Sequence, residues 1–538
     1  MLEIVSAADS NFITLYDTTL RDGSQGEDIL FSVDDKLRIT KRLDSLGVPF
    51  IEGGWPGANP KDDAFFSEVR KLTLKNSRVS AFASTKRPGG AVEDDKTMQG
   101  LLAAETGVVT IFGKSWDLHV RDALNISLEE NLELIFESIR FLKSRVDTVF
   151  YDAEHFFDGH KANPEYALKT LIAARDAGAD ALVLCETNGG RLVGEVVRST
   201  EAALELGATV GIHTHNDSGL AVANTLAAVE AGATHVQGTI NGIGERCGNC
   251  DLTTVIPNLL MKMGRKSDVW PEQLQNLTGV SRFVDEMINR SPRKNQPFVG
   301  QSAFAHKGGI HVSAVSKNSA TYEHIRPELI GNKQRILVSD QSGKSNLVAK
   351  LAEFGITNLD SQDSRLQELL ADVKDLESRG YQFDGADASF ELRARRAMDQ
   401  VPEFFKLQGF RVIDERRQRN GNGPIVGAEA TVKLNVANRL VHLVWEGAGP
   451  VDSLHGALCR ALEWYYPSIN DVKLVDFKVR ILSGIGTGAR VRVLIEWQDG
   501  EQRWGTVGVS DHIIAASYDA MVEALVYKLY IDGVVPAK

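Results

Sequence analysis

Two histidines lie two residues apart in the segment Gly211–Asp217, whose sequence is GIHTHND. Because side chains alternate along a β-strand, a strand here would point His213 and His215 to the same face. Two imidazoles on one face can hold one divalent metal ion, and a carboxylate would complete the site. Near the N-terminus, the sequence YDTTLRDG offers Asp22 for this role. Its neighbour Arg21 keeps its charge and suits holding a carboxylate or polarising a carbonyl.

Three further polar residues stand where apolar runs of the chain end. Glu154 closes one such run, and from its position it could be a base, an acid or a buried hydrogen-bond partner. Thr187 closes the next run, and Asn249 lies in the loop beyond the last one. These residues form one site only if the fold brings the ends of several strands together.

Short apolar runs alternate with longer segments of helical spacing from residue 13 to about 260. The eight runs are Ile13–Leu20, Pro49–Gly54, Arg78–Ser84, Val108–Gly113, Asp147–Glu154, Ala181–Thr187, Thr209–His215 and His235–Asn241. Strand–helix alternation predicts a parallel sheet, either a closed (β/α)8 barrel or an open doubly wound sheet. The barrel is favoured because chemically active residues recur at the ends of many strands. In a closed barrel, strands one, seven and eight are neighbours, which would unite Asp22 with His213 and His215. We therefore expect a catalytic (β/α)8 barrel over residues 1–270.

The rest of the chain divides into two further regions by its patterns. Residues 271–413 have mainly helical spacing with charged faces and include the segment HKGGIH, which ends at His311. The charged and Gly-rich stretch Asp414–Pro424 predicts a linker or loop. Residues 425–538 predict a separate α+β domain. Its strands are expected at Glu429–Val436, Leu440–Trp445, Val472–Ile481, Arg490–Trp497 and Gln502–Val509, and its helices at Val451–Tyr465 and Ser517–Tyr530.

Composition narrows the class of protein. The formal net charge of -12 argues against nucleic acid as the main partner. Four cysteines in 538 residues do not make a disulfide framework, which fits a reducing cytoplasm. The N-terminus lacks the pattern of a signal peptide, and no run approaches the ~18–20 apolar residues of a membrane helix. We expect a cytoplasmic enzyme without a membrane partner.

In combination, several motifs resemble the metal-dependent aldolase-like acyltransferase family of isopropylmalate, homocitrate and citramalate synthases. TTLRDGSQ is similar to the first-strand signature of the family, HTHND to its metal motif, GERCGN to its eighth-loop motif and HKGGIH to the segment with its catalytic histidine. The segments GAGPVDSLHGAL and GVSDHIIAAS resemble its amino-acid-binding regulatory domain. The resemblance covers nearly the whole chain.

The family resemblance implies a role for each candidate residue. Asp22, His213 and His215 would bind a divalent metal ion (Mn²⁺, Mg²⁺ or Zn²⁺), with Asn249 adjacent or ligating. Arg21 would hold a 2-oxo acid, whose carboxylate Thr187 would bind. Acid–base roles would fall to Glu154 and His311, with Tyr322 assisting. The sequence departs from the family at Glu186, where an aspartate is frequent before the threonine.

The segment IEGGWPG, followed by NPKD, looks most like the citramalate branch, because isopropylmalate synthases tend to have Ala-Gly-Phe-Pro there. This implies condensation of acetyl-CoA with pyruvate, feedback by isoleucine, and a homodimer in which the segment around His311 reaches the neighbouring barrel. The alternatives are a 2-isopropylmalate synthase acting on 2-oxoisovalerate, a lyase on the same barrel, and an amino-acid-binding protein without catalysis.

Overall fold

The computed structural model describes residues 11–337, 344–357, 363–418, 424–483, 488–500 and 502–538. The chain forms two compact units. The first comprises Met1–Phe304 and Ile325–Gln334, and the second comprises Ala305–His324 and Arg335–Lys538.

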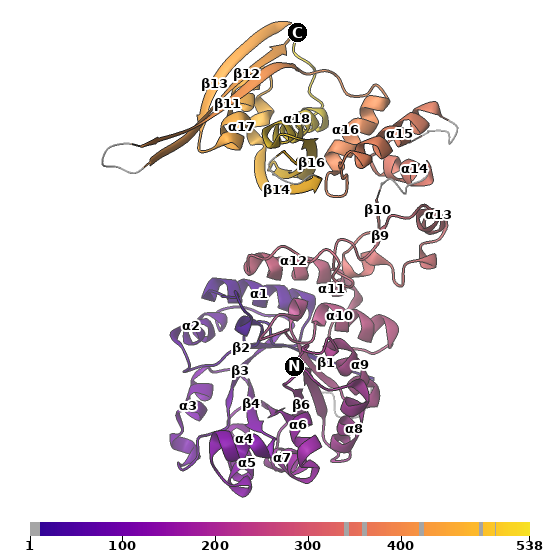
Figure 1. Ribbon diagram of the computed structural model, residues 1–538. Helices are drawn as coiled ribbons and strands as arrows, with labels where there is room; N and C mark the ends of the chain where they lie inside the picture. Colours follow the sequence, from indigo (N-terminus) through magenta and orange to yellow (C-terminus); the bar gives the residue numbers. More distant parts are fainter. Residues whose placement is uncertain (1–10, 338–343, 358–362, 419–423, 484–487, 501) are drawn as a thin grey trace. The chain divides into compact units, whose positions relative to one another are not determined.

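Eight parallel strands of the first unit form a closed barrel in sequential order (Figure 1). They are β1 (Thr14–Asp17), β2 (Phe50–Gly54), β3 (Arg78–Ser84), β4 (Val108–Lys114), β5 (Thr148–Glu154), β6 (Ala181–Glu186), β7 (Val210–Thr214) and β8 (His235–Gly238). Closure is made by β8, which pairs with β1 as well as with β7. Each predicted apolar run overlaps one strand, and the closed barrel is confirmed over the open sheet.

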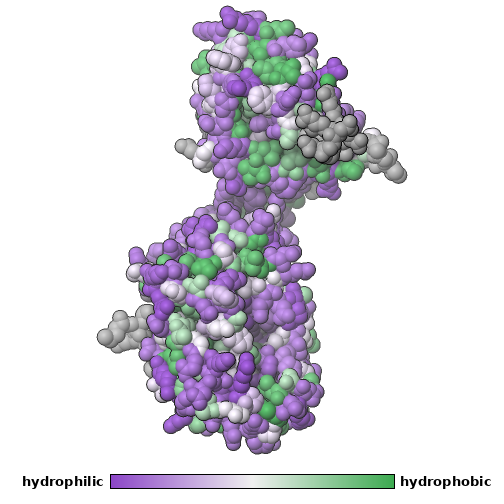
Figure 2. All heavy atoms as spheres, turned by 90° about the vertical axis from the view of Figure 1, so that its left-hand side faces the viewer, coloured by the Kyte–Doolittle hydropathy of each residue, from purple (hydrophilic) through white to green (hydrophobic). Residues whose placement is uncertain are grey.

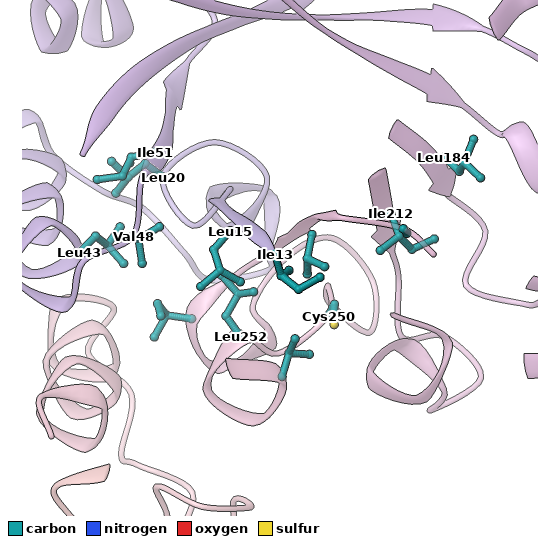
Figure 3. Close-up of a cluster of buried hydrophobic side chains, with 14 of the residues drawn as sticks. Ile13, Leu15, Leu20, Leu43, Val48, Ile51, Leu184, Ile212, Cys250 and Leu252 are labelled. Atoms are coloured by element: carbon teal, nitrogen blue, oxygen red, sulfur yellow. The ribbon is translucent and has the colours of Figure 1, made fainter. Parts of the chain in front are cut away.

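Helices surround the barrel between successive strands and after β8. They are α1 (Val33–Leu46), α2 (Pro60–Val69), α3 (Lys96–Ala103), α4 (Asp117–His119), α5 (Leu128–Lys143), α6 (Phe156–Ala162), α7 (Pro164–Ala177), α8 (Val193–Leu204), α9 (Ala221–Ala231) and α10 (Leu252–Pro257). Local sequence sets where helix α1 begins and ends. Ser32 and Asp35 form a capping box at its start, and Gly47 ends it with a φ of 89°. Its buried Ile39 and Leu43 join the core between helices and strands, part of which Figure 3 labels.

The inside of the barrel has a polar layer below its mouth. The Tyr16 hydroxyl donates to Glu52 Oε2 at 2.8 Å and lies 2.7 Å from Thr110 Oγ1. Asp152 and Gln237 lie in the same interior, and all five side chains are buried. Branched apolar residues dominate most barrel interiors. A polar layer here therefore indicates that the polar groups at the mouth of the barrel need hydrogen-bonding partners beneath them.

After β8, the first unit continues with α11 (Pro271–Leu274) and α12 (Leu277–Met287). The second unit begins with β9 (Ala305–His306), α13 (Gly309–Lys317) and β10 (Arg335–Ile336), followed by α14 (Lys344–Glu353), α15 (Ser364–Ser378) and α16 (Asp387–Ala397). The mainly helical character predicted for this region is confirmed.

The C-terminal part repeats one arrangement, three antiparallel strands followed by a helix. The first copy is β11 (Lys406–Gln418), β12 (Pro424–Val436), β13 (Arg439–Gly447) and α17 (Pro450–Leu462). The second copy is β14 (Lys473–Ser483), β15 (Arg490–Gln498), β16 (Arg503–Ser510) and α18 (Ile513–Ile531). One hydrophobic core serves both copies and includes Leu454, Trp497 and Leu525.

The prediction of a linker or loop at Asp414–Pro424 was wrong for most of its length. Asp414 pairs with Ala428 and Glu415 with Gly427, so this charged stretch belongs to a hairpin of β11 and β12. Its charges mislead because Asp414 and Glu415 are exposed, where a strand accepts polar residues. Residues 419–423 lie outside the described residues.

Polar side chains predominate on the visible faces of both units, with apolar patches between them (Figure 2). The second unit exposes large apolar side chains on β13 and β14, among them Leu440, Val444, Val479 and Ile481. Across the described residues, every helix is too short or too polar to span a membrane.

Candidate active site

Closure of the barrel brings three metal-binding side chains to one point. Asp22 follows β1, His213 lies in β7, and His215 comes directly after β7. His213 Nε2 is 3.2 Å and His215 Nε2 is 4.0 Å from Asp22 Oδ2. All three side chains are buried, and one donor atom from each lies within 4.8 Å of the others. This geometry can hold one divalent ion.

The charges of these groups also suit a cation. Burial alone would raise the pKa of Asp22, but Arg21 and the two histidines hold it well below its usual range. Burial and the neighbouring His213 lower the pKa of His215 to about 4. At neutral pH Asp22 is therefore a carboxylate and His215 an uncharged imidazole, which are the forms that bind metal. Burial would lower the pKa of His213, but its hydrogen bond to Asp22 raises it, so metal binding there would release a proton.

Asn249 stands next to this group. It forms an antiparallel bridge with His215, and its Nδ2 donates to the Ile243 carbonyl at 3.2 Å. Its Oδ1 is buried and, among the described residues, has no hydrogen-bond partner; the same holds for His215 Nδ1. A buried polar atom without a partner calls for an explanation, and a cation beside the amide oxygen supplies one. The residues present fit a divalent metal ion.

Arg21 is held in place by a carboxylate that the sequence analysis missed. Its Nε donates to Glu52 Oε1 at 2.5 Å, and its guanidinium carbon lies 3.7 Å from the centroid of the Phe82 ring. Its Nη1 is 3.6 Å from Asp22 Oδ2. Glu52 is fully buried in β2. The sequence does contain a signal for this pair: Glu52 lies inside an apolar run, and a buried carboxylate requires a cation or hydrogen-bond donors nearby.

An aromatic wall of Trp55, Phe82 and Phe112 stands beside Arg21. The Trp55 ring lies 6.0 Å from Phe82 and 5.8 Å from Phe112, and the two phenylalanines stack at 5.4 Å. The Trp55 amide donates to Asp62 at 3.1 Å, and Asp62 also pairs with buried Lys36 at 2.6 Å. The GGWPG and NPKD motifs thus form one structure that holds the wall.

Glu154 and Thr187 lie at the ends of β5 and β6. Lys114, at the end of β4, forms an ion pair with Glu154. The Thr187 hydroxyl accepts a hydrogen bond from the His155 amide at 3.0 Å, which leaves its own proton free to donate.

A clamp connects the loops around Thr187. Arg246 donates to both carboxylate oxygens of Asp217 at 2.7 and 2.9 Å, and to the Thr187 carbonyl at 2.6 Å. The HTHND and GERCGN motifs therefore position the threonine as well as the metal group.

Three family models match the chain in succession. They are HMGL-like over residues 12–284, homocitrate synthase post-HMGL domain-like over 298–381, and the LeuA allosteric (dimerisation) domain over 384–529. The (R)-citramalate synthase of Geobacter sulfurreducens is 54% identical over 97% of this chain and 98% of its own length. That of Aquifex aeolicus is 52% identical over 97% and 98%. The chain belongs to the citramalate synthase family.

The sequence identities decide between the citramalate and isopropylmalate branches of the family. The probable 2-isopropylmalate synthase of Methanopyrus kandleri is 32% identical over 95% of this chain and 97% of its own length. The prediction of the citramalate branch from the GGWPG segment is therefore confirmed, and so is the acyltransferase class.

The last two candidate residues of this citramalate synthase family member, His311 and Tyr322, belong to the second unit. His311, in α13, stacks on Tyr322 with the ring centroids 4.2 Å apart. Tyr322 is 47% exposed. Their part in the barrel's chemistry stays a prediction.

Proposed function

We propose that the chain condenses acetyl-CoA with pyruvate to give (R)-citramalate and free coenzyme A. The observation that carries this proposal is the position of Arg21 between the Asp22–His213–His215 group and the aromatic wall. A 2-oxo acid needs cationic and hydrogen-bonding groups for its oxygens and an apolar surface for its alkyl group, and this arrangement supplies both.

The oxygens of the oxo acid would be held by three sets of groups. Arg21, anchored through Nε, would direct its Nη atoms to the keto oxygen and stabilise the negative charge that develops there. Thr187 would donate to the carboxylate. A divalent ion (Mn²⁺, Mg²⁺ or Zn²⁺) held by Asp22, His213, His215 and Asn249 would supply Lewis-acid chemistry.

Carbon–carbon bond formation requires a base and an acid. Glu154 would remove a proton from the acetyl methyl group, and the resulting carbanion equivalent would attack the keto carbon. The keto oxygen takes up a proton from His311, with Tyr322 assisting. Water then cleaves the thioester, which releases the coenzyme A thiol and a second carboxylate.

The aromatic wall favours the smallest oxo acid. Trp55, Phe82 and Phe112 are bulky, so a methyl group would fit beside them better than an isopropyl group. Each extra methylene changes recognition by about 1–3 kcal/mol, so slow turnover of 2-oxobutanoate is expected.

Regulation and assembly would belong to the second unit. We propose that residues 425–538 bind isoleucine and that two chains form a homodimer in the cytoplasm. The match to the LeuA allosteric (dimerisation) domain supports an effector site and a dimer, and the choice of isoleucine follows from the citramalate branch. Exposed apolar side chains of β13 and β14 offer a surface that a second copy could cover.

Release of the coenzyme A thiol from acetyl-CoA, measured with a panel of 2-oxo acids, tests the proposed reaction. Pyruvate should give the highest kcat/KM. A higher value for 2-oxoisovalerate would make the chain a 2-isopropylmalate synthase, with leucine as the expected effector.

The variant Phe82→Leu tests the wall and should raise kcat/KM for 2-oxobutanoate relative to pyruvate. Phe150→Leu is the matched control, because Phe150 packs against Tyr16 and Phe50 in a buried cluster that contains none of the wall residues. It should leave the preference unchanged.

A further inference from the structure

A buried amide lies behind the metal-binding His213. His213 Nδ1 is 2.8 Å from Gln237 Oε1, and Gln237 Nε2 donates to Asp152 Oδ1 at 3.0 Å. Gln237 is fully buried and Asp152 is 3% exposed. The sequence did not indicate a role for either residue. Asp152 lies in β5 and Gln237 in β8, and their contact appears only once the barrel is formed.

The surroundings of Gln237 decide which way its amide points. Its Nε2 faces the Asp152 carboxyl on one side and lies 3.5 Å from His235 Nε2 on another. Burial lowers the pKa of His235 to about 3, so this imidazole is uncharged and can accept a hydrogen bond. With acceptors on the nitrogen side, the oxygen of the amide must face His213.

An amide oxygen accepts but cannot donate, so it requires a proton on His213 Nδ1. The other ring nitrogen, Nε2, is then the atom left for a metal ion, and it lies 3.2 Å from Asp22 Oδ2. Histidines that bind metals usually donate their second ring N–H to an acceptor of this kind.

We propose that Gln237, oriented by Asp152, is a positioning residue that fixes the ring and tautomer of His213 for metal binding. The inference rests on the proposed metal site. It assigns a role to two of the five side chains in the polar layer inside the barrel: Asp152 fixes the amide, the amide fixes the imidazole, and the imidazole presents Nε2.

Mn²⁺ binding to the full-length protein, followed by the EPR signal of free Mn²⁺, tests this role without any need for turnover. Gln237→Met keeps the size of the side chain but removes the acceptor, and it should weaken Mn²⁺ binding by about 10–100-fold. Gln237→Glu should bind nearly as well as the wild type. A proton shared between the introduced carboxyl and its neighbour Asp152 lets the new side chain donate to Asp152 and still accept from His213.

Thr110→Val is the matched control for a merely structural effect. It removes buried hydrogen bonds to Tyr16 and Ser80 in the same interior layer, and neither of these partners is a metal ligand. It should lower the melting temperature and leave Mn²⁺ affinity unchanged. Equal affinity of Gln237→Met and the wild type, or an equal loss in Thr110→Val, would overturn the inference.

Asp152→Asn tests the same relay in a chain that keeps Gln237, should Gln237→Met fold poorly. Its loss of Mn²⁺ affinity should be smaller, and the double variant should bind no more weakly than Gln237→Met alone. Additive losses would show that Asp152 acts independently, which contradicts the relay. If the wild type itself binds no Mn²⁺, the proposed metal site fails rather than the role of Gln237 alone.

Discussion

Arg21 and Glu52 form a buried ion pair through a single guanidinium nitrogen, with Nε 2.5 Å from Oε1. Because Glu52 takes Nε, the two Nη groups stay available to other partners. Tyr16 donates to the second carboxylate oxygen of Glu52 at 2.8 Å, so the acid itself is held from below. The polar interior of the barrel thus positions the cation at its mouth.

Arg21→Lys should lower kcat severely. A lysine supplies one point charge in place of a planar fork and cannot satisfy Glu52 and a substrate oxygen together. Loss of one donor to a developing oxyanion typically costs ~10²–10³ in turnover. The measurement is steady-state kinetics with pyruvate and acetyl-CoA. A kcat within about twofold of the wild type would exclude Arg21 as the electrophilic group.

His213→Ala should abolish bound metal and activity while leaving the fold mostly intact, because the barrel core consists of other side chains. Metal content by emission spectroscopy and far-UV circular dichroism measure the two effects. His160→Ala is the control, since His160 lies in α6 and contacts Ser199 instead. Full activity of a demetallated sample in the presence of chelator would contradict the metal site.

Mixing two inactive variants, His311→Ala and Asp22→Ala, should restore part of the activity under conditions that exchange subunits. If His311 serves the neighbouring subunit's barrel, a mixed dimer holds one site with both residues intact. Subunit exchange is verified by differently tagged chains. No recovery despite proven exchange would mean that His311 serves its own subunit or has no part in catalysis.

Isoleucine should inhibit the full-length protein, and leucine should not. Calorimetry should show that isoleucine still binds the His213→Ala variant, which establishes an effector site separate from the metal group. Loss of isoleucine binding in that variant, or purely competitive inhibition against pyruvate, would place the amino acid in the active site instead.

Asp17 should make stability depend on pH. Burial raises the pKa of its carboxyl from 3.8 to about 7 in the folded protein, against the opposing hydrogen bonds from Thr19. Between these values only the unfolded chain loses the proton, so the contribution of Asp17 to folding falls as the pH rises from about 4 to about 7. It changes no further above that range.

Asp17→Asn should remove this dependence. The free energy of unfolding of the variant, relative to the wild type, should rise between pH 4 and pH 7 and then stay level. Urea unfolding at a series of pH values measures it. Parallel curves for the two proteins across this range would show that Asp17 does not titrate on folding.

Local patterns in the sequence were sufficient to predict the barrel's strands and the shared face of the two metal-binding histidines. Alternation of apolar runs with helical spacing predicted all eight barrel strands. A buried parallel strand and an amphipathic helix each give a characteristic pattern of apolar residues over a short stretch of sequence. The spacing of His213 and His215 likewise predicted a shared face. The hairpin of β11 and β12 was missed, because an exposed strand face carries charges as readily as a loop does.

Tertiary structure alone decided which distant residues meet. Closure of β1 against β8 brought Asp22 to His213, and the pairing of β1 with β2 placed Glu52 beside Arg21. The closed barrel also set Gln237 between Asp152 and His213. No local period encodes these contacts, since they depend on the register of strands far apart in the chain. The sequence by itself therefore determined the elements and the chemical groups, whereas the barrel's closure determined the partner, the charge state and the orientation of each group.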